Sequence, residues 1–556
     1  MTRFVAGIVS VLFVAACATQ DVQQSSRADI AGYADELLLR TYRSDAPGAA
    51  ILVAQSDTVL FRGARGEADV ATDAQLRPDS VFRIGSITKQ FTAAAVLTLV
   101  EDGHVRLDDP LSRHLPDYPN GDNITVLQLL NHTAGVRNFN GLPNYVEGIE
   151  RDLTTAEIIN LFRDEPVDFA PGANWAYSNS GYVLLGAVIE RVTGMAWHAY
   201  LEQRFFRPLG MRHTGYGHDP RFAAQQVLGY SYHDGSVAPM RSMSMTQPHA
   251  AGALVSNIND LLIWNHALHE GRVLRSEAYV RMVTPEGAAA GEGIRYGFGL
   301  YEHNIRGHRA LQHGGRIFGF IASLTYLPGP DITVVVLEND DAHNGLEQAD
   351  ALARRLAAAA LGEPYPDMTA VPVGVDAMQE MVGVYDFGDG VTRTLRIGDG
   401  QLTAQRGAGP RAVLTPIGAD DFLYEDGFNR LRLERDAAGA VVAARFFANG
   451  DGAGDRGVRS SIEVGAPTGL QLPRADLERL IGVYANNEVA VSVTLEGEVL
   501  MGQIADQEAF RLLATAPGQF DVEEAGASVE FSPGEGPAAE LIIRQNGRET
   551  SLRRTP

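Results

Sequence analysis

The chain changes character near residue 363, and this change constrains its fold more than any other feature. Residues 28–362 mix helical and strand-like patterns, whereas the chain beyond residue 376 alternates short strands with glycine turns. Residues 363–375 contain three prolines and little periodicity, which is typical of a linker. Because 556 residues are too many for one ordinary core, the break predicts separate domains on its two sides.

The part after the linker contains an internal repeat. Met381–Tyr385 matches Leu480–Tyr484 in sequence, with a shift of 99 residues from Gly383 to Gly482. Downstream, Thr394–Ile397 parallels Ser492–Leu495. The repeat predicts two related β-barrel-like domains at 376–464 and 472–556, joined by a second linker at 465–471.

The first domain, residues 28–362, opens and closes with similar elements. Helical periodicity over 28–43 is followed by strand patterns at 48–54 and 58–63. Near the end, apolar runs at 323–327 and 332–337 form a predicted hairpin, and an alanine-rich helix is expected over 346–361. This order is typical of an antiparallel sheet covered by terminal helices.

The N-terminus predicts export. Arg3 precedes an apolar stretch over residues 4–16, which is too short for a permanent membrane span. Val14–Cys17 resembles a bacterial lipobox, which predicts a signal peptide over 1–17, lipidation of Cys17 and a tether over 18–27. Ala18 after the cysteine favours the periplasmic face of the outer membrane. The alternative is a signal peptide cleaved without lipidation.

Charge and cysteine content exclude some classes of protein. The formal net charge is −23, which repels nucleic acid, so we expect no nucleic-acid partner. Cys17 is the only cysteine, so no disulfide can form within the chain, and the cores must supply the stability.

The chain holds 46 lysine and arginine residues, and Lys89 is its only lysine. Chance could explain this bias, but arginine cannot release a proton near neutral pH, whereas a desolvated lysine can. Lys89 lies three residues after Ser86 at a predicted helix start, so both side chains share one helical face. Burial among Ile84 and Phe91 would lower the pKa of Lys89 and let it activate Ser86 as a nucleophile. The simpler interpretation of Ser86 is a helix cap.

Two further motifs carry candidate site residues. Tyr177 and Asn179 precede a predicted apolar helix over 181–192, where a tyrosine can shuttle protons and an amide can hold a carbonyl. A cap with a buried aromatic ring is the alternative. His313–Gly315 precedes an apolar run over 317–321, where glycines let a substrate backbone approach a strand edge. A plain turn is the alternative there.

The three motifs together resemble the serine β-lactamase and penicillin-binding protein superfamily in its class C branch, which includes D-aminopeptidases and esterases. The order S-x-x-K, Y-x-N and H-x-G fits, with 91 and 136 residues between successive motifs. Leu129–Gly135 and Ala251–Ser256 also match. The resemblance covers residues 28–362 and implies an α+β fold: an antiparallel sheet flanked by helices plus an all-helical subdomain, before the two barrel-like domains.

The resemblance also implies roles for individual residues. Ser86 would attack a carbonyl to form an acyl-enzyme, with Lys89 and Tyr177 as coupled base and acid. The amide groups of Ser86 and Arg316 would form the oxyanion hole. The substrate-binding residues would be Asn179, His313, Gly315 and Arg316. No cofactor or metal is implied, and His266, His269 and Glu270 match no zinc signature, so a helix surface is the preferred interpretation.

The choice of substrate stays open. His313 stands where β-lactamases and DD-peptidases usually carry a lysine that pairs with a substrate carboxylate, and neutral histidine binds a carboxylate less well. This difference favours a serine hydrolase acting on amides or peptides, such as D-amino-acid or peptidoglycan-like peptides. An esterase is the close alternative, a β-lactamase or DD-carboxypeptidase the next, and a non-catalytic ligand sensor the last. The sequence does not predict the oligomeric state.

Overall fold

The structure of the protein is a computed structural model. It describes residues 30–555 with these gaps: 143–144, 146–147, 234–235, 292–293, 342–348, 367–368, 389–391, 399, 408–410, 425–427, 451, 463–471, 487–488, 498, 505–508, 517, 523–526, 533–535 and 546–547. Its internal contacts divide the chain into two units, Met1–Pro366 and Asp367–Pro556, which are described separately.

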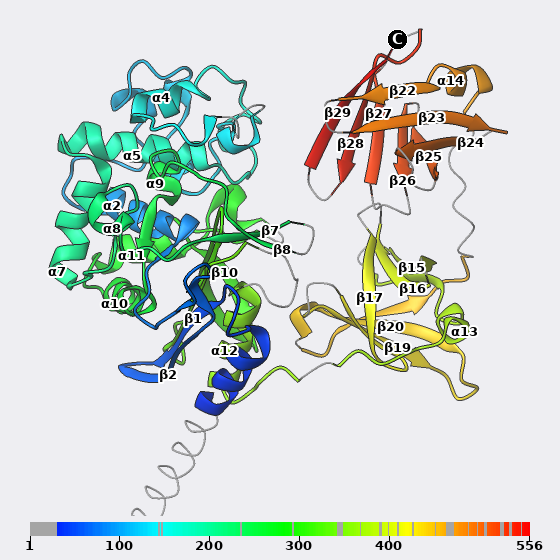
Figure 1. The fold of residues 1–556 in the computed structure, drawn as a ribbon, viewed down its shortest axis with the longest axis horizontal. Helices are drawn as coiled ribbons and strands as arrows, with labels where there is room; N and C mark the ends of the chain where they lie inside the picture. Colours follow the sequence, from blue (N-terminus) through cyan, green and yellow to red (C-terminus); the bar gives the residue numbers. More distant parts are fainter. Residues whose placement is uncertain are drawn as a thin grey trace, which may run out of the picture. The chain divides into compact units, whose positions relative to one another are not determined.

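A 6-stranded antiparallel sheet forms the centre of the first unit (Figure 1). In spatial order its strands are β10 (Tyr301–Ile305), β11 (His308–Ile317), β12 (Phe320–Leu327), β13 (Ile332–Glu338), β1 (Ala49–Gln55) and β2 (Thr58–Arg65). The first and last strands along the chain therefore meet in the middle, where β1 pairs with β13 from Ala49–Glu338 to Gln55–Ile332. Each of the four predicted strand patterns corresponds to one of these strands.

Both faces of the sheet are covered. Ala50, Leu52 and Ala54 of β1 join the large core that also contains residues of α2 and α10, while Ile51 and Val53 are equally buried. Because successive strand residues point to opposite faces, β1 is packed on both sides. The helix at residues 30–41 and α12 (Ala349–Ala360) match the two predicted terminal helices.

The predicted helical region lies between β2 and β10. Its helices are α2 (Thr88–Glu101), α3 (Val126–Leu130), α4 (Thr155–Asn160), α5 (Asn179–Thr193), α6 (Trp197–Leu201), α7 (Arg207–Leu209), α8 (Pro220–Ala223), α9 (His249–Gly252), α10 (Ile258–His269) and α11 (Ser276–Val283). Short turns of 3-10 or π helix lie at Gly85–Ile87, Leu111–Arg113, Gly121–Asn123, Phe139–Gly141, Glu202–Phe206 and Gly287–Ala290. The buried helix α2 packs against α5 and α9 (Figure 1), which gives the site a rigid base.

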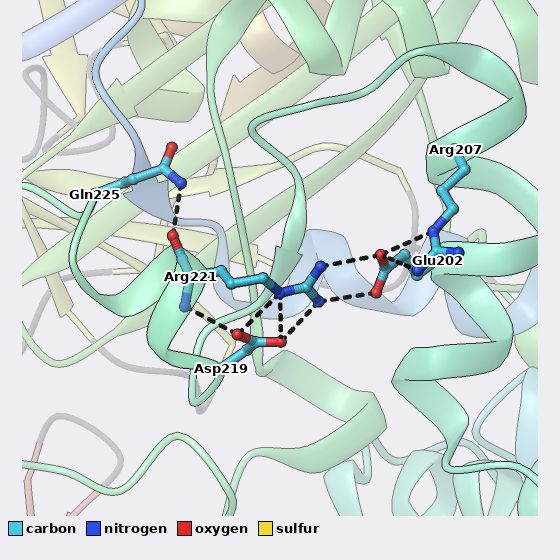
Figure 2. Close-up of polar contacts among 5 residues, drawn as sticks. All are labelled: Glu202, Arg207, Asp219, Arg221 and Gln225. Atoms are coloured by element: carbon cyan, nitrogen blue, oxygen red, sulfur yellow. Dashed lines mark hydrogen bonds and ion pairs between the residues drawn. The ribbon is translucent and has the colours of Figure 1, made fainter.

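Small sheets and one ion-pair cluster hold the loops between these helices. The sheets are β3 (Glu67–Asp69) with β4 (Ala74–Gln75), β5 (Phe82–Arg83) with β9 (Leu254–Ser256) and β6 (Gly215–Tyr216), and β7 (Tyr230–His233) with β8 (Ser236–Pro239). Figure 2 shows Arg221 between Asp219 and Glu202, with Arg207 on the other side of Glu202. The cluster links α8 to the turn at Glu202–Phe206.

The second unit contains two closed barrels, which confirms the predicted barrel-like domains. The first is formed by β14 (Gly383–Asp386), β15 (Thr392–Gly398), β16 (Gln401–Arg406), β17 (Arg411–Gly418), β18 (Asp421–Tyr424), β19 (Arg430–Arg435), β20 (Val441–Phe447) and β21 (Asp455–Arg459). The second is formed by β22 (Gly482–Ala485), β23 (Ala490–Glu496), β24 (Val499–Ile504), β25 (Phe510–Ala516), β26 (Gln519–Val522), β27 (Ala527–Phe531), β28 (Glu540–Gln545) and β29 (Arg548–Arg554). Short helices α13 (Val375–Gln379) and α14 (Arg474–Glu478) precede them, and a 3-10 turn at Ala448–Gly450 follows β20.

The sequence repeat is also a structural repeat. Tyr385 donates a hydrogen bond to the carbonyl of Met381, and Tyr484 donates the equivalent bond to Leu480. Arg459 of β21 and Arg554 of β29 each bind the carbonyls just before the first strand of their own barrel. An arginine in the last strand of each barrel therefore makes equivalent hydrogen bonds to the segment before the first strand.

Several predictions fall outside the described residues. These are the signal peptide over 1–17 with Cys17, the tether over 18–27, and the linker at 465–471. Within the described part of the chain, no helix combines the length and apolar character that a membrane span requires.

Candidate active site

Ser86 and Lys89 meet at the start of α2. Ser86 lies in the 3-10 turn Gly85–Ile87 directly before the helix, and its hydroxyl caps neither element. The Nζ atom of Lys89 lies 3.1 Å from the Oγ atom of Ser86. The side chain of Lys89 is fully buried, whereas Ser86 is partly exposed. The hydroxyl of a partly exposed serine therefore lies within hydrogen-bond distance of a buried amine.

Two fixed acceptors orient the amine of Lys89. Its Nζ donates to Oδ1 of Asn179 at 2.7 Å and to the carbonyl of Ala251 at 2.8 Å. The amide of Asn179 is fixed in turn, because its Nδ2 donates to Oδ1 of Asn140 at 2.7 Å. A neutral amine has two hydrogens and one lone pair. In that neutral form, with both hydrogens directed at Asn179 and Ala251, the lone pair is left for the third neighbour, Ser86.

The environment favours this neutral form. Burial lowers the pKa of Lys89 well below its usual value, because a charged amine loses its hydration there. Burial and the nearby Lys89 also lower the pKa of His132, and they bring that of His313 to about 3. Burial therefore disfavours a positive charge on each of these three nitrogen bases.

Tyr177 completes the polar centre. Burial raises its pKa well above the usual value, and a hydrogen bond to Ser86 offsets part of this rise. The ring of Tyr177 lies beside the amine, with Nζ of Lys89 4.7 Å from the ring centroid. Its hydroxyl stays protonated at neutral pH, so in this arrangement Lys89 can accept a proton and Tyr177 can donate one.

His313 lies in the middle of β11 and not in a turn. Its Nδ1 hydrogen bonds to the carbonyl of Gly314 at 2.6 Å, and its Nε2 lies 3.1 Å from the hydroxyl of Tyr296. The predicted strand edge is also present: β10 pairs with β11 only from Ile305–His308 to Tyr301–Gln312. The half of β11 from His313 onward is not paired with β10.

Glycines bring this free half of β11 against the nucleophile turn. A Cβ atom on Gly315 would lie 2.0 Å from the carbonyl oxygen of Ile84, and one on Gly85 would lie 2.9 Å from the amide nitrogen of Arg316. Gly85 also has a positive φ of 48°. The backbones of the turn and the strand are therefore in direct contact, with the amides of Ser86 and Arg316 close to this junction.

Aromatic rings surround the polar centre. We call Trp175, Tyr177, Tyr296 and Tyr301 the aromatic wall. Tyr296 lies 4.6 Å from Tyr301 between ring centroids, Trp175 lies 6.4 Å from Tyr301, and Tyr301 lies 5.4 Å from His313. Trp175 and Tyr301 are half-buried. The wall offers apolar surface to a ligand bound at Ser86.

The sequence motifs located some of these residues and missed others. Ser86, Lys89, Tyr177 and His313 come together as the resemblance implied, and Asn179 holds Lys89. Its predicted contact with substrate stays a prediction. The motifs gave no sign of Asn140, Trp175, Tyr296 or Tyr301. His132 and Ala251 fell within matching stretches, but nothing in their sequence context indicated a role.

A candidate group of metal ligands lies on other elements. Within the described residues, Asp57, His266 and Glu270 place ligand atoms within 4.8 Å of one another. His269 is not part of this group, because its Nδ1 lies 2.7 Å from the hydroxyl of Tyr279 and its ring stacks on Tyr326. Asp57 and Glu270 are exposed, and Glu270 pairs with Arg272.

Several known proteins are similar to this chain in sequence. A D-aminopeptidase of Gluconobacter oxydans (strain 621H) is 26% identical over 474 residues, 83% of this chain and 84% of that protein. Esterase EstB of Burkholderia gladioli is 35% identical over 228 residues, 37% of this chain and 56% of the esterase. A protein of Bacillus subtilis (strain 168) named putative penicillin-binding protein PbpX is 30% identical over 254 residues, 46% of this chain and 61% of that protein.

The chain is also similar to a solved structure of a related enzyme. The D-amino acid amidase of Ochrobactrum anthropi SV3 in complex with L-phenylalanine amide is 26% identical, with a TM-score of 0.54. The match covers 61% of this chain and 99% of the amidase. Residues 21–359 match the Beta-lactamase family, which is more than half of the chain. The protein therefore belongs to the Beta-lactamase family of serine hydrolases.

Proposed function

We propose that the protein is an exported hydrolase that forms an acyl-enzyme on Ser86 and acts on amides or peptides, with D-amino-acid or peptidoglycan-like peptides as the favoured substrates. The observation that carries the proposal is the buried Lys89, whose Nζ lies 3.1 Å from Oγ of Ser86 and within hydrogen-bond distance of two acceptors, Asn179 and Ala251. When the amine is neutral, these acceptors can take its two hydrogens, which leaves its lone pair for the hydroxyl of Ser86. Such a pair needs no other base to make a serine nucleophilic.

The proposed reaction uses each polar group in turn. Neutral Lys89 takes the proton of Ser86 while Oγ attacks the substrate carbonyl. The oxyanion that forms lies at the junction of turn and strand, where the amides of Ser86 and Arg316 stabilise it. Tyr177 donates a proton to the leaving amine and regains one from Lys89. Water then attacks the ester of Ser86 and releases the acid.

The absence of charge on His313 supports the substrate class. With a pKa of about 3, this side chain offers no cation to a substrate carboxylate at neutral pH. Penicillins and D-alanyl-D-alanine termini carry such a carboxylate, whereas amides and uncharged esters do not. The similarity to a D-aminopeptidase and to a D-amino acid amidase supports the proposal of amides as the first substrate class.

The aromatic wall fits an apolar or aromatic side chain next to the scissile bond. The similarity to esterase EstB favours ester hydrolysis as the second candidate, and the same wall would receive the acyl group of an ester. A β-lactamase or DD-carboxypeptidase is the third candidate.

Labelling and a substrate panel test the proposal. A fluorophosphonate probe should label the wild-type protein and leave Ser86→Ala unlabelled. D-amino-acid anilides should be hydrolysed faster than nitrocefin, with p-nitrophenyl esters measured alongside. A folded wild-type protein that takes no label would instead be a ligand sensor. Nitrocefin turnover far above that of the esters would reverse the order of the substrates.

The predicted N-terminus completes the proposal. We propose that Cys17 is lipidated and anchors the protein to the outer membrane on its periplasmic side. Mass spectrometry of the protein purified from membranes should find an acylated N-terminal cysteine, and Cys17→Ala should move the protein to the soluble periplasmic fraction. Membrane association that is unchanged in Cys17→Ala would contradict the anchor.

A further inference from the structure

A cavity of about 250 Å³ lies beside strand β5, between the segments 217–229 and 240–245. It could hold far more than one water molecule, which takes up roughly 30 Å³ in the liquid. Its polar lining includes Arg83, His218 and Gln226, and its apolar lining includes Met240, Met243 and Met245. None of these residues belongs to the catalytic arrangement proposed above.

Arg83 brings an unbalanced charge to this cavity. Its Nε donates to Oε1 of Gln226 at 3.1 Å, and its guanidinium lies over the ring of Phe320. Its Nη1 is buried and has no hydrogen-bond partner among the described residues, and none of their carboxylates pairs with it. Burial lowers the pKa of Arg83 to about 10. The side chain of Arg83 is half-buried, and a guanidinium without an ion-pair partner is stabilised by an anion that reaches the part of it exposed to the cavity.

The rest of the lining limits the kind of anion. The carboxylate of Asp152 lies 3.7 Å from the imidazole of His218 and accepts a hydrogen bond from Ser244, so these polar groups already have partners. Among the described residues that line the cavity, Arg83 is the one permanent cation. One guanidinium can pair bidentately with a carboxylate and balance its single charge, whereas a phosphate dianion beside the same guanidinium would keep a net negative charge. The methionine side chains adapt to apolar chains of varied shape.

We propose that this cavity binds a small monocarboxylate with a short apolar chain, the carboxylate paired with Arg83 and the chain packed against Met240, Met243 and Met245. Ser86 is not among the residues that line the cavity, so the inference does not depend on the proposed function. Arg83 nevertheless lies close to Ser86 in the sequence, because it is in β5, three residues before the serine. In the small sheet it pairs with Val255 of β9.

Calorimetric titration with sodium octanoate tests the proposal, with octanamide as the uncharged analogue. Wild type should bind octanoate at least about tenfold more tightly than octanamide, which is the usual contribution of a charged hydrogen bond. Arg83→Met should lose this preference. Arg241→Gln removes an exposed arginine of the neighbouring segment and should bind like wild type. Ser86→Ala should also bind like wild type.

Each contrary result overturns the proposal. One such result is equal affinity of the wild type for octanoate and octanamide, and another is an Arg83→Met variant that binds octanoate as tightly as the wild type does. The third is loss of octanoate binding in Ser86→Ala, which would show that octanoate binds at Ser86. If Arg83→Met does not fold, Val227→Phe decides the question, because it fills the cavity and keeps the charge. Octanoate binding should then fall at least about tenfold, and unchanged affinity would overturn the site.

Discussion

At the scale of single residues, the question is why Lys89 must be a lysine. Lys89→Arg keeps a positive charge but cannot supply a lone pair, because a guanidinium stays protonated at any working pH. We expect kcat/KM for a p-nitrophenyl ester to fall by about 10³-fold or more. Arg106→Lys, the reverse exchange at an exposed position, should leave the rate unchanged. Wild-type rates in a folded Lys89→Arg protein would disprove the assigned role.

The lowered pKa of Lys89 also predicts how activity depends on pH. Below that pKa the amine is protonated and cannot accept the proton of Ser86, so kcat/KM should rise with pH through a value well below 10.5. Between this pKa and 10.5 the unfolded chain binds more protons than the folded one, so this group also makes stability rise with pH. A pH–rate profile checks the first statement. A rise only near 10.5 would show that Lys89 is not the base.

The motifs predicted which residues meet in the site, but not how they are held. Ser86 and Lys89 are three residues apart, so local helix geometry was enough to place them together. Ala251 of α9 contacts Lys89, and Asn140 of the 3-10 turn Phe139–Gly141 contacts its partner Asn179, both from segments far away in the sequence. No local sequence pattern marks a backbone carbonyl or an asparagine as a tertiary hydrogen-bond acceptor, so these contacts could not be predicted.

At the scale of elements, the contact between strand β11 and the turn Gly85–Ile87 should be the most sensitive to side-chain volume. Gly315→Ala places a methyl group 2.0 Å from the carbonyl oxygen of Ile84, so strand and turn must separate. We expect unfolding to become easier by about 1–3 kcal/mol and kcat/KM to fall by roughly 100-fold.

Gly329→Ala is the matched control for this change. It lies in the turn between β12 and β13, and no atom lies within 4 Å of the position of its new Cβ. Stability by urea unfolding and the rate with a p-nitrophenyl ester should both stay at wild-type values. If Gly315→Ala behaves like this control, the turn and strand do not need their close approach.

In contrast to the contact at Gly315, the ion-pair cluster around Arg221 should contribute little to the free energy of unfolding. The side chain of Arg221 is 58% exposed, so its pairs with Asp219 and Glu202 are weakened by water and salt (Figure 2). Arg221→Gln should cost less than about 1 kcal/mol, and less still in high salt. Asp219→Ala should cost more, because Asp219 also caps α8. Urea unfolding at two salt concentrations checks this order, and the reverse order would contradict it.

Strand and helix patterns predicted the elements well where the chain is apolar throughout. The runs at 323–327 and 332–337 became β12 and β13 because both are buried on each face. The triplet at His313 is harder to interpret, since glycines are as typical of turns as of strands that touch another backbone. Only the tertiary contact with Ile84 explains why these glycines lie within a strand.

At the scale of the whole molecule, the internal sequence repeat gave the clearest prediction of the domain organisation. The shared pattern at Tyr385 and Tyr484 identified two domains of one kind, and the structure places both hydroxyls on equivalent carbonyls. Arg459 and Arg554 close the barrels in the same way, but they are 95 residues apart and not 99. Different loop lengths between the repeats hide this equivalence in the sequence.

Each unit has hydrophobic cores of its own, and this leads to a prediction about truncation. The core around α2 contains residues up to Leu337, whereas the two barrel cores contain residues from Met378 onward. A fragment that ends at Pro366 keeps every residue of the candidate active site. It should fold alone and hydrolyse a small p-nitrophenyl ester with kcat/KM within about twofold of the full chain. The fragment that starts at Asp367 should fold without activity.

Calorimetry of the full chain supplies the second measurement. Because units with separate cores unfold separately, we expect more than one transition, and one of them should coincide with that of the fragment ending at Pro366. The small ester matters in this test, since a large peptide could lose affinity merely because a barrel that binds it is missing. A folded fragment that has lost its activity on the small ester would show that the barrels help to form the site at Ser86. The domains could then no longer be treated as independent.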